Sequence, residues 1–231
     1  MLLKTKNLMK AFGGLKAINK VDFELPAGEI RGIIGPNGSG KSTFFNLVSG
    51  VYDPDPGSYI EFDGHDITNE PPHKIGALGL SRTFQLLRLY QDMSVINNVM
   101  SGYHTRVKYK FFDAVIGRKK IWDQEKEIKD EMMELLSFVG LADYAELNAS
   151  ELSGGQRRLL VLARAIAMKP KLLMLDEPAA GLSPVNVDNL MKIIMQLKDK
   201  YGLTLIIIEH ILKVVMDLSL IHISEPTRQP C

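Results

Sequence analysis

Short apolar runs bounded by glycine- or proline-containing turns recur along the chain. Residues 21–25, 29–34 and 59–62 have the length and the turn signals of strands. Residues 172–175 are apolar at every position, and residues 203–208 at all but one. Such runs are typical of strands that are buried on both faces of a sheet.

Between these runs, apolar side chains recur at helical spacing. In a charged background, the three- and four-residue repeat comprises Ile128, Met132, Leu135, Leu136 and Val139. Helices are also predicted over about 153–168 and 185–201, and a further strand over 80–85. Strands separated by helices predict an α/β fold with a parallel sheet covered on both sides. The stretch from about 86 to 155 is predicted to be an inserted helical subdomain.

The composition is that of a globular chain without an excess of either charge. The 231 residues include 28 Lys and Arg and 27 Asp and Glu, giving a formal net charge of +1, and 45% are hydrophobic. This balance excludes disorder and a general polyanion binder, which needs a cationic excess. The single cysteine, Cys231, permits no internal disulfide, and no apolar run approaches the ~20 residues that span a bilayer. With no signal-peptide pattern at its start, the chain is expected to be cytoplasmic.

A glycine-rich loop follows the strand predicted over 29–34 and opens a helix. It matches G-x-x-x-x-G-K-S, in which backbone N–H groups surround phosphate oxygens. Lys41 is expected to reach the β- and γ-phosphates, and the Ser42 hydroxyl to bind Mg²⁺. A purely structural glycine turn is the alternative, although it does not account for the flanking strand and helix. The residues expected to contact nucleotide are Gly35, Pro36, Asn37, Gly38, Ser39, Gly40, Lys41, Ser42 and Thr43.

Two carboxylates end the apolar strand predicted over 172–175. At this end of a strand in an open α/β sheet, an acidic side chain faces the ligand crevice, so Asp176 is expected to hold Mg²⁺ through its water shell. Glu177 is expected to orient or deprotonate the attacking water. A solvated acidic turn is the alternative for this run taken alone.

Leu152-Ser153-Gly154-Gly155-Gln156 begins the helix predicted over 153–168. Ser153 is a good N-cap, and Gly154 and Gly155 leave N–H groups uncovered, so Ser153 to Gln156 are expected to form a second phosphate-recognising helix start. An ordinary capped helix is the alternative. A P-loop kinase, which transfers phosphate to a small acceptor, does not account for these five residues.

Together, these motifs resemble the ATP-binding subunits of ABC transporters, and the resemblance extends from Leu2 to about Ser219. It implies a P-loop NTPase (RecA-like) core, an N-terminal antiparallel β subdomain and an inserted helical subdomain. It also implies ATP and Mg²⁺ as cofactors, and ATP hydrolysis coupled to transmembrane transport. Two such chains pair head to tail in this family, so that the signature motif of one closes over the phosphates held by the other.

The resemblance assigns roles to three further residues. Gln85 matches the glutamine that senses Mg²⁺ and water and touches the membrane subunit, and it is therefore a catalytic and metal-site candidate. His210 matches the catalytic histidine that contacts the γ-phosphate, and Phe12 the aromatic residue on which adenine stacks. Without the resemblance, Gln85 fits a surface residue equally well, and His210 fits a structural histidine equally well. A phenylalanine near a glycine turn, such as Phe12, is more often a core residue.

Four segments are most similar to importers of branched-chain and other hydrophobic amino acids, namely 12–17, 82–85, 93–100 and 177–182. This similarity implies a second, identical or related ATPase subunit, permease subunits and, indirectly, a solute-binding protein. It implies a peripheral position on the inner face of the cell membrane. The alternatives are an exporter ATPase of the lipopolysaccharide type and a soluble ABC ATPase acting on nucleic acid. A net charge of +1 disfavours nucleic acid as a partner.

The last twelve positions, 220–231, have neither helical nor strand periodicity. They resemble translated sequencing-adapter read-through, whereas the family continues into further strands and a closing helix. We expect an ABC ATPase domain over 1–219, followed by a non-native tail in place of the native C-terminal end. Sequencing the source gene across this junction tests the expectation.

Overall fold

The computed structural model describes residues 1–83, 89–103 and 118–209, and for 118–124 the backbone alone. These residues form two compact units, one drawn from Met1–Gln85 and Lys171–Cys231 and the other from Leu86–Pro170. The insertion predicted over about 86–155 is therefore longer in the structure. The physical reason is that helix α6 (Gly154–Ala167) packs on helices of the same unit. The tail at 220–231 lies outside the described residues.

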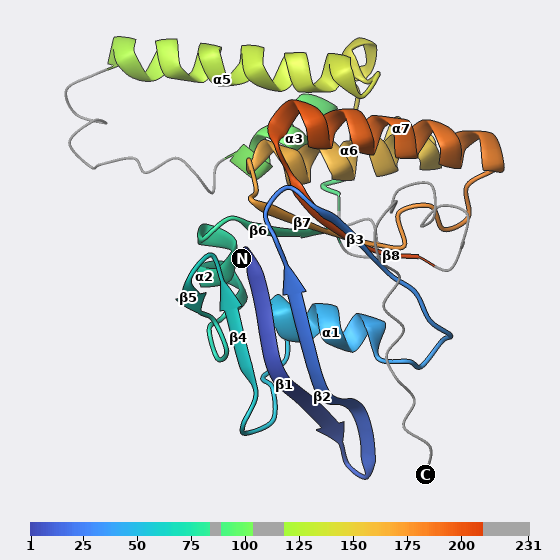
Figure 1. The fold of residues 1–231 in the computed structure, drawn as a ribbon. Helices are drawn as coiled ribbons and strands as arrows, with labels where there is room; N and C mark the ends of the chain where they lie inside the picture. Colours follow the sequence, from blue (N-terminus) through green and yellow to red (C-terminus); the bar gives the residue numbers. More distant parts are fainter. Residues whose placement is uncertain (84–88, 104–117, 210–231) are drawn as a thin grey trace. The chain divides into compact units, whose positions relative to one another are not determined.

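The first unit contains an antiparallel sheet of strand order β2-β1-β4-β5 (Figure 1). Its strands are β1 (Leu3–Phe12), β2 (Leu15–Leu25), β4 (Tyr59–Phe62) and β5 (His65–Asp66). β2 begins well before the run predicted over 21–25, and most of its side chains are exposed or half-buried. An antiparallel sheet can expose one face to water, so its strands can contain many polar residues. A strand of this kind extends beyond the apolar run in the sequence. The predicted N-terminal β subdomain is confirmed.

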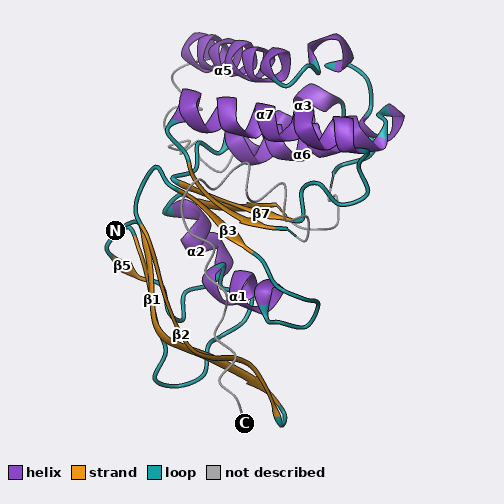
Figure 2. Ribbon diagram, turned by 45° about the vertical axis from the view of Figure 1, so that its right-hand side comes forward, coloured by secondary structure: helices purple, strands orange, loops and turns teal. Residues whose placement is uncertain are grey.

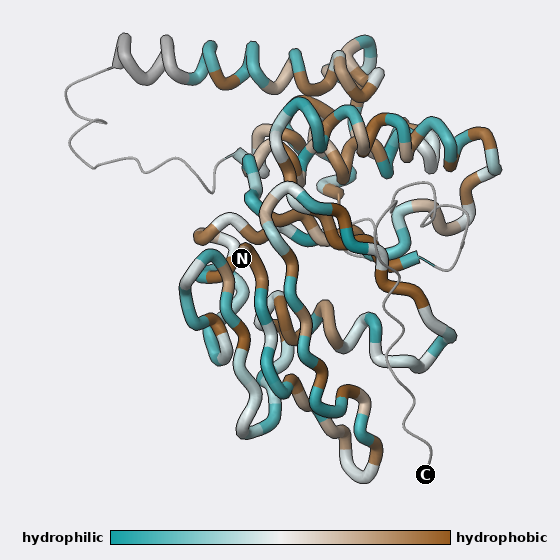
Figure 3. Tube along the Cα trace, viewed as in Figure 1, coloured by the Kyte–Doolittle hydropathy of each residue, from teal (hydrophilic) through white to brown (hydrophobic). Residues whose placement is uncertain are grey.

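The same unit contains a parallel sheet of strand order β3-β8-β7-β6. Its strands are β3 (Ile30–Ile33), β8 (Thr204–Ile208), β7 (Leu172–Asp176) and β6 (Leu80–Thr83). Every residue of β7 and β8 is buried, and Figure 3 shows both as predominantly hydrophobic. The α/β fold with a parallel sheet is therefore confirmed.

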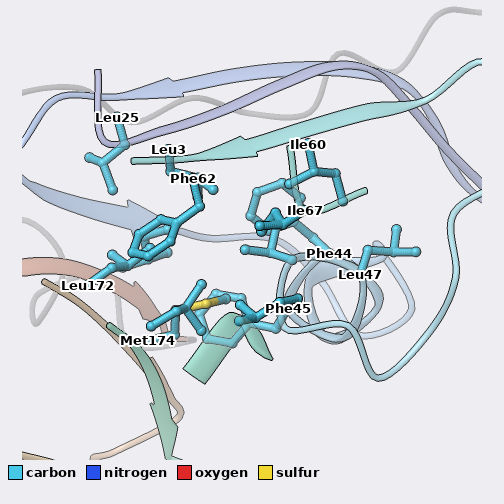
Figure 4. Packing of buried hydrophobic residues seen from close by; sticks show 14 of the residues in the cluster. Leu3, Leu25, Phe44, Phe45, Leu47, Ile60, Phe62, Ile67, Leu172 and Met174 are labelled. Atoms are coloured by element: carbon cyan, nitrogen blue, oxygen red, sulfur yellow. The ribbon is translucent and has the colours of Figure 1, made fainter. Parts of the chain in front are cut away.

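Helix α1 (Lys41–Val48) lies between the two sheets of this unit. Figure 4 shows Leu3 and Phe62 of the antiparallel sheet, Phe45 of α1 and Met174 of β7 within one buried cluster. Helix α7 (Pro184–Tyr201) lies on the opposite side of the parallel sheet from α1 (Figure 2). A short helix, α2 (Pro72–Ala77), precedes β6. The buried side chains of α1 hold this helix in place, and its start directly follows the glycine-rich loop.

The second unit is helical, as predicted. It contains α3 (Val95–Tyr103), α5 (Arg118–Phe138), the 3₁₀ turns η2 (Ala142–Tyr144) and η3 (Ala149–Glu151), and α6. α3 and α6 approach closely at Gly102, where a Cβ would lie 2.3 Å from the carbonyl oxygen of Arg164. Of the predicted apolar face of α5, Ile128 is half-buried and the other members are buried. Within the described residues, the helices are all too short or too polar to cross a membrane.

Candidate nucleotide-binding site

Three strands of the parallel sheet end side by side. Ile33, the last residue of β3, lies opposite Ile208 of β8, and Ile208 lies opposite Asp176 of β7. The glycine-rich loop follows β3, so this loop and the carboxylate of Asp176 start from one row across the sheet. Ligands of open α/β sheets bind at this carboxyl edge.

The glycine-rich loop has the backbone conformation that its glycines allow. Gly38 and Gly40 have φ angles of 82° and 93°. A Cβ on Gly40 would lie 2.4 Å from the carbonyl oxygen of Ala17 in β2, so only glycine fits there. Gly40 directly precedes α1, and among the described residues no side chain caps this helix. The N–H groups of its first turn are therefore available to a ligand, as the anion-binding role requires.

Lys41 lies inside the curl of this loop. Its Nζ donates hydrogen bonds to the carbonyl oxygens of Gly35, at 2.7 Å, and of Pro36, at 2.9 Å. Burial lowers the pKa of Lys41, and the carboxylates of Glu177 and Asp176 oppose that shift. The ammonium group is thus held at the loop, within electrostatic reach of the two carboxylates predicted to act beside it.

Asp176 is paired with an arginine that the sequence reasoning missed. Its Oδ2 lies 2.9 Å from Nη2 of Arg82 on β6, and both side chains are buried. The other terminal nitrogen, Nη1, donates to Oδ1 of Asn46 at 2.6 Å and to Oγ of Ser49 at 3.2 Å, and the guanidinium lies over the ring of Phe45. Arg82 therefore connects β7 with the helix that follows the glycine loop. An arginine within a strand of a buried sheet is the only sequence signal for this role.

The donor set at the loop fits Mg²⁺. Ser42 is exposed at the first turn of α1, and the carboxylate of Asp176 ends β7. In the part of the chain that the structure describes, no three His, Cys, Asp or Glu side chains cluster as a self-sufficient metal cage. Mg²⁺ is commonly bound by one or two protein oxygens together with substrate phosphates and water. A hydroxyl and a carboxylate next to a phosphate-binding loop meet that requirement.

Glu177 has an unusual backbone conformation. Its φ angle of 49° is left-handed, which costs a non-glycine residue roughly 1–2 kcal/mol. Its backbone N–H donates to the carbonyl oxygen of Ile208 at 3.0 Å, and its side chain is half-buried. Strained residues of this kind persist only where the surrounding structure fixes them, and they concentrate at functional sites. The sequence gives no signal for this conformation.

The signature motif, in the second unit, forms a capped helix start. Ser153 Oγ accepts a hydrogen bond from the Gln156 N–H at 3.3 Å, and Gln156 Oε1 accepts one from the Ser153 N–H at 2.9 Å. This reciprocal pair is a capping box and confirms Ser153 as the N-cap. A Cβ on Gly154 or on Gly155 would meet nothing within 4 Å. The two glycines therefore leave open space at the helix start.

Phe12 is the last residue of β1 and is 45% exposed. The structure therefore excludes the core alternative for this residue. Its ring meets that of Tyr52 edge to face, with centroids 5.5 Å apart, and Lys10 Nζ lies 5.6 Å from the Phe12 centroid. Tyr52 is a neighbour that the sequence reasoning missed. Gln85 and His210 lie outside the described residues.

The sequence profile of one family, ABC transporter, matches residues 18–180, which is more than half of the chain. That span contains the glycine loop, the signature motif and the two carboxylates. The chain belongs to the ABC transporter family. It is an ABC ATPase, and the predicted resemblance is confirmed.

Curated members of the ABC transporter family resemble the chain over most of its length. It is 43% identical over 209 residues to the "Probable branched-chain amino acid transport ATP-binding protein LivG" of Archaeoglobus fulgidus, covering 89% of this chain and 78% of the relative. It is 38% identical over 218 residues to the "High-affinity branched-chain amino acid transport ATP-binding protein LivG" of Escherichia coli K12, covering 94% and 85%.

A solved ABC cassette has the same fold. The ADP conformation of MJ1267, an ATP-binding cassette of an ABC transporter, matches with a TM-score of 0.79 and 34% identity, covering 94% of this chain and 84% of that one. The predicted RecA-like architecture of an ABC ATPase is confirmed by this likeness.

Proposed function

We propose that the chain is the ATP-hydrolysing subunit of an ABC importer for branched-chain or other hydrophobic amino acids. The observation that carries this proposal is the assembly of Lys41, Asp176 and Glu177 at one sheet edge of an ABC ATPase. The substrate class comes from the relatives, whose names describe branched-chain amino acid transport.

The glycine loop binds the triphosphate. Lys41 exchanges the carbonyl oxygens of Gly35 and Pro36 for phosphate oxygens, a stronger set of acceptors because they are charged. Ser42 and Asp176 hold Mg²⁺, which when bound neutralises charge on the phosphates. Phe12 stacks on the adenine, and its exposed ring leaves a face for that contact.

Glu177 orients or deprotonates the attacking water. By the family pattern, Gln85 senses Mg²⁺ and that water, and His210 contacts the γ-phosphate. The signature residues Ser153, Gly154, Gly155 and Gln156 close over the triphosphate bound to a second chain. ATP binding thus closes a dimer, and hydrolysis reopens it.

The dimer acts on permease subunits and, through them, works indirectly with a solute-binding protein. It is peripheral on the inner face of the cell membrane. An exporter of the lipopolysaccharide type and a nucleic-acid ATPase remain the competing functions. The relatives favour import, since their names specify amino acid transport.

Co-purification followed by reconstitution tests the proposal. The tagged chain is isolated from its own membranes, the permease subunits that accompany it are identified, and the complex is placed in vesicles with its solute-binding protein. We expect ATP-dependent uptake of radiolabelled leucine. A matched complex carrying Glu177→Gln is expected to bind ATP, remain closed and lose at least about 10²-fold in hydrolysis. ATP hydrolysis without leucine uptake, but with extraction of lipopolysaccharide, would identify an exporter instead.

A further inference from the structure

A buried acid directly follows strand β8. All five residues of β8 are buried, four of them are apolar, and the next residue, Glu209, is only 2% exposed. A buried carboxylate is unfavourable unless hydrogen bonds or charges compensate it. The hydrogen bonds of the Glu209 carboxylate therefore indicate its role.

The carboxylate of Glu209 holds the turn that follows β7. Its Oε1 accepts a hydrogen bond from the backbone N–H of Ala179 at 2.8 Å, and both residues are buried. One position earlier on β8, the carbonyl oxygen of Ile208 accepts the N–H of Glu177 at 3.0 Å. The end of β8 thus fixes two points of this turn, one at Glu177 and one two residues beyond it.

This turn contains the left-handed backbone of Glu177. Within it, the Ala180 N–H donates to the Glu177 carbonyl oxygen at 3.1 Å, and the Leu182 N–H donates to that of Ala179 at 3.1 Å. These short-range bonds fold the turn on itself, whereas the bonds to Ile208 and Glu209 attach it to the sheet. A strained residue keeps one conformation only when the surrounding structure fixes it by several such contacts.

We propose that Glu209 is a positioning residue, which acts through the Ala179 N–H to hold Glu177 in the conformation that orients the attacking water. The effect of Glu209 on catalysis rests on the proposed function, in which the chain hydrolyses ATP. The hydrogen bond itself, between the side chain of Glu209 and the turn after β7, is independent of what the protein transports. A misplacement of a catalytic group by about 1 Å can lower the rate by about 10²-fold.

Two substitutions in the full chain separate the hydrogen bond from the charge. Glu209→Met removes the acceptor and keeps an apolar side chain of similar length, which suits the end of an apolar strand. Glu209→Gln keeps an Oε1 acceptor and removes the charge. Each variant is compared with the wild type in ATP hydrolysis, in its melting transition and in amide hydrogen exchange of residues 177–183, with α1 as the internal reference.

For Glu209→Met we expect a cooperative melt, a kcat at least about tenfold lower, a KM for ATP changed by less than about threefold, and faster exchange in 177–183 alone. Glu209→Gln is expected to stay within about threefold of the wild type in kcat. Wild-type kcat and exchange in Glu209→Met would overturn the inference. An equal loss of hydrolysis in Glu209→Gln and Glu209→Met would also overturn it. So would the loss of both ATP binding and the cooperative melting transition in Glu209→Met, because that result would indicate a role in the fold alone.

The two hypotheses fail separately. If the wild-type complex hydrolyses no ATP, the proposed function is wrong, and the exchange of 177–183 in Glu209→Met still decides whether this hydrogen bond holds the turn. If the complex hydrolyses ATP and takes up leucine, and Glu209→Met hydrolyses ATP at the same rate, the proposed function stands and the positioning role is wrong.

Discussion

Helices α1 and α6 both begin at a glycine-rich motif, but they satisfy their first N–H groups differently. At α1, the residue before the helix is Gly40, with a left-handed backbone and, within the described residues, no side-chain cap. At α6, Ser153 and Gln156 exchange two hydrogen bonds and close the helix start on itself. One start leaves its donors open, and the other uses a side chain of its own motif.

This difference separates a ligand-dependent helix start from a self-sufficient one. The open donors of α1 and the nearby ammonium of Lys41 supply, within a single chain, the groups that the proposed anion site needs. The start of α6 is stable by itself, so the role proposed for it toward a second chain depends on the exposed Ser153 and Gly154. In the structure, the Gln156 side chain serves its own helix.

The largest effect is expected where α1 is fixed to the sheet, at Arg82. Arg82→Met should lower the free energy of unfolding by about 3–5 kcal/mol, because it leaves Asp176 buried without its cation. Chemical denaturation measures the change. Adding Asp176→Asn to Arg82→Met removes the uncompensated charge and should restore part of the stability. A single variant as stable as the wild type would contradict the role of the pair.

A second experiment compares the two glycines directly. Gly40→Ala should destabilise the chain by about 3 kcal/mol, since a left-handed backbone and a contact at 2.4 Å both oppose a Cβ. Gly154→Ala is the matched control, because a Cβ there meets nothing within 4 Å. Thermal melting of both variants measures the difference. An equal loss of stability in Gly40→Ala and Gly154→Ala would contradict the predicted difference between the two positions.

The third effect is on nucleotide affinity. Lys41→Ala should weaken binding of a non-hydrolysable ATP analogue about 30-fold, or about 2 kcal/mol, because it removes the charged donor at the loop. Titration calorimetry gives the affinity. Lys16→Ala, an exposed lysine on β2, is the control and should bind as the wild type does. Unaltered affinity in Lys41→Ala would contradict the anion site at α1.

The smallest effect concerns the cap of α6. Gln156→Ala should destabilise the chain by about 0.5–1 kcal/mol, because it breaks one half of the capping box. Gln156→Glu keeps the box and should be as stable as the wild type, yet it places a negative charge where the triphosphate of a second chain is proposed to bind. Denaturation and ATP hydrolysis should therefore respond differently in the two variants. Wild-type hydrolysis in Gln156→Glu would argue against that contact.

The sequence predicts those parts of the fold and site that are local. The helix after the glycine loop, the apolar strands β7 and β8 and the cap at Ser153 follow from neighbouring residues, and the structure contains them. Periodicity does not predict α3, because this helix contains a polar residue, Asn98, that is fully buried and bonds to the backbone of Tyr90 and Met93.

Local sequence patterns do not predict contacts between distant segments. Arg82 and Asp176 are 94 positions apart, and Glu209 and Ala179 are 30 apart. A pattern marks Arg82, Asp176 and Glu209 only as polar residues within or beside apolar runs, and the strand order brings each of them to its partner. The length of β2 is missed for a related reason, since its solvated face carries polar residues.

The strand order also bears on how the site forms during synthesis. β8 is the last strand described along the chain, yet it separates β3 from β7. A ribosome-bound chain that has emerged only as far as residue 203 already contains the glycine loop and both acids, but it lacks the strand that spaces them. Nascent chains of that length should be unable to retain ATP, and their exposed strand edges would need a chaperone.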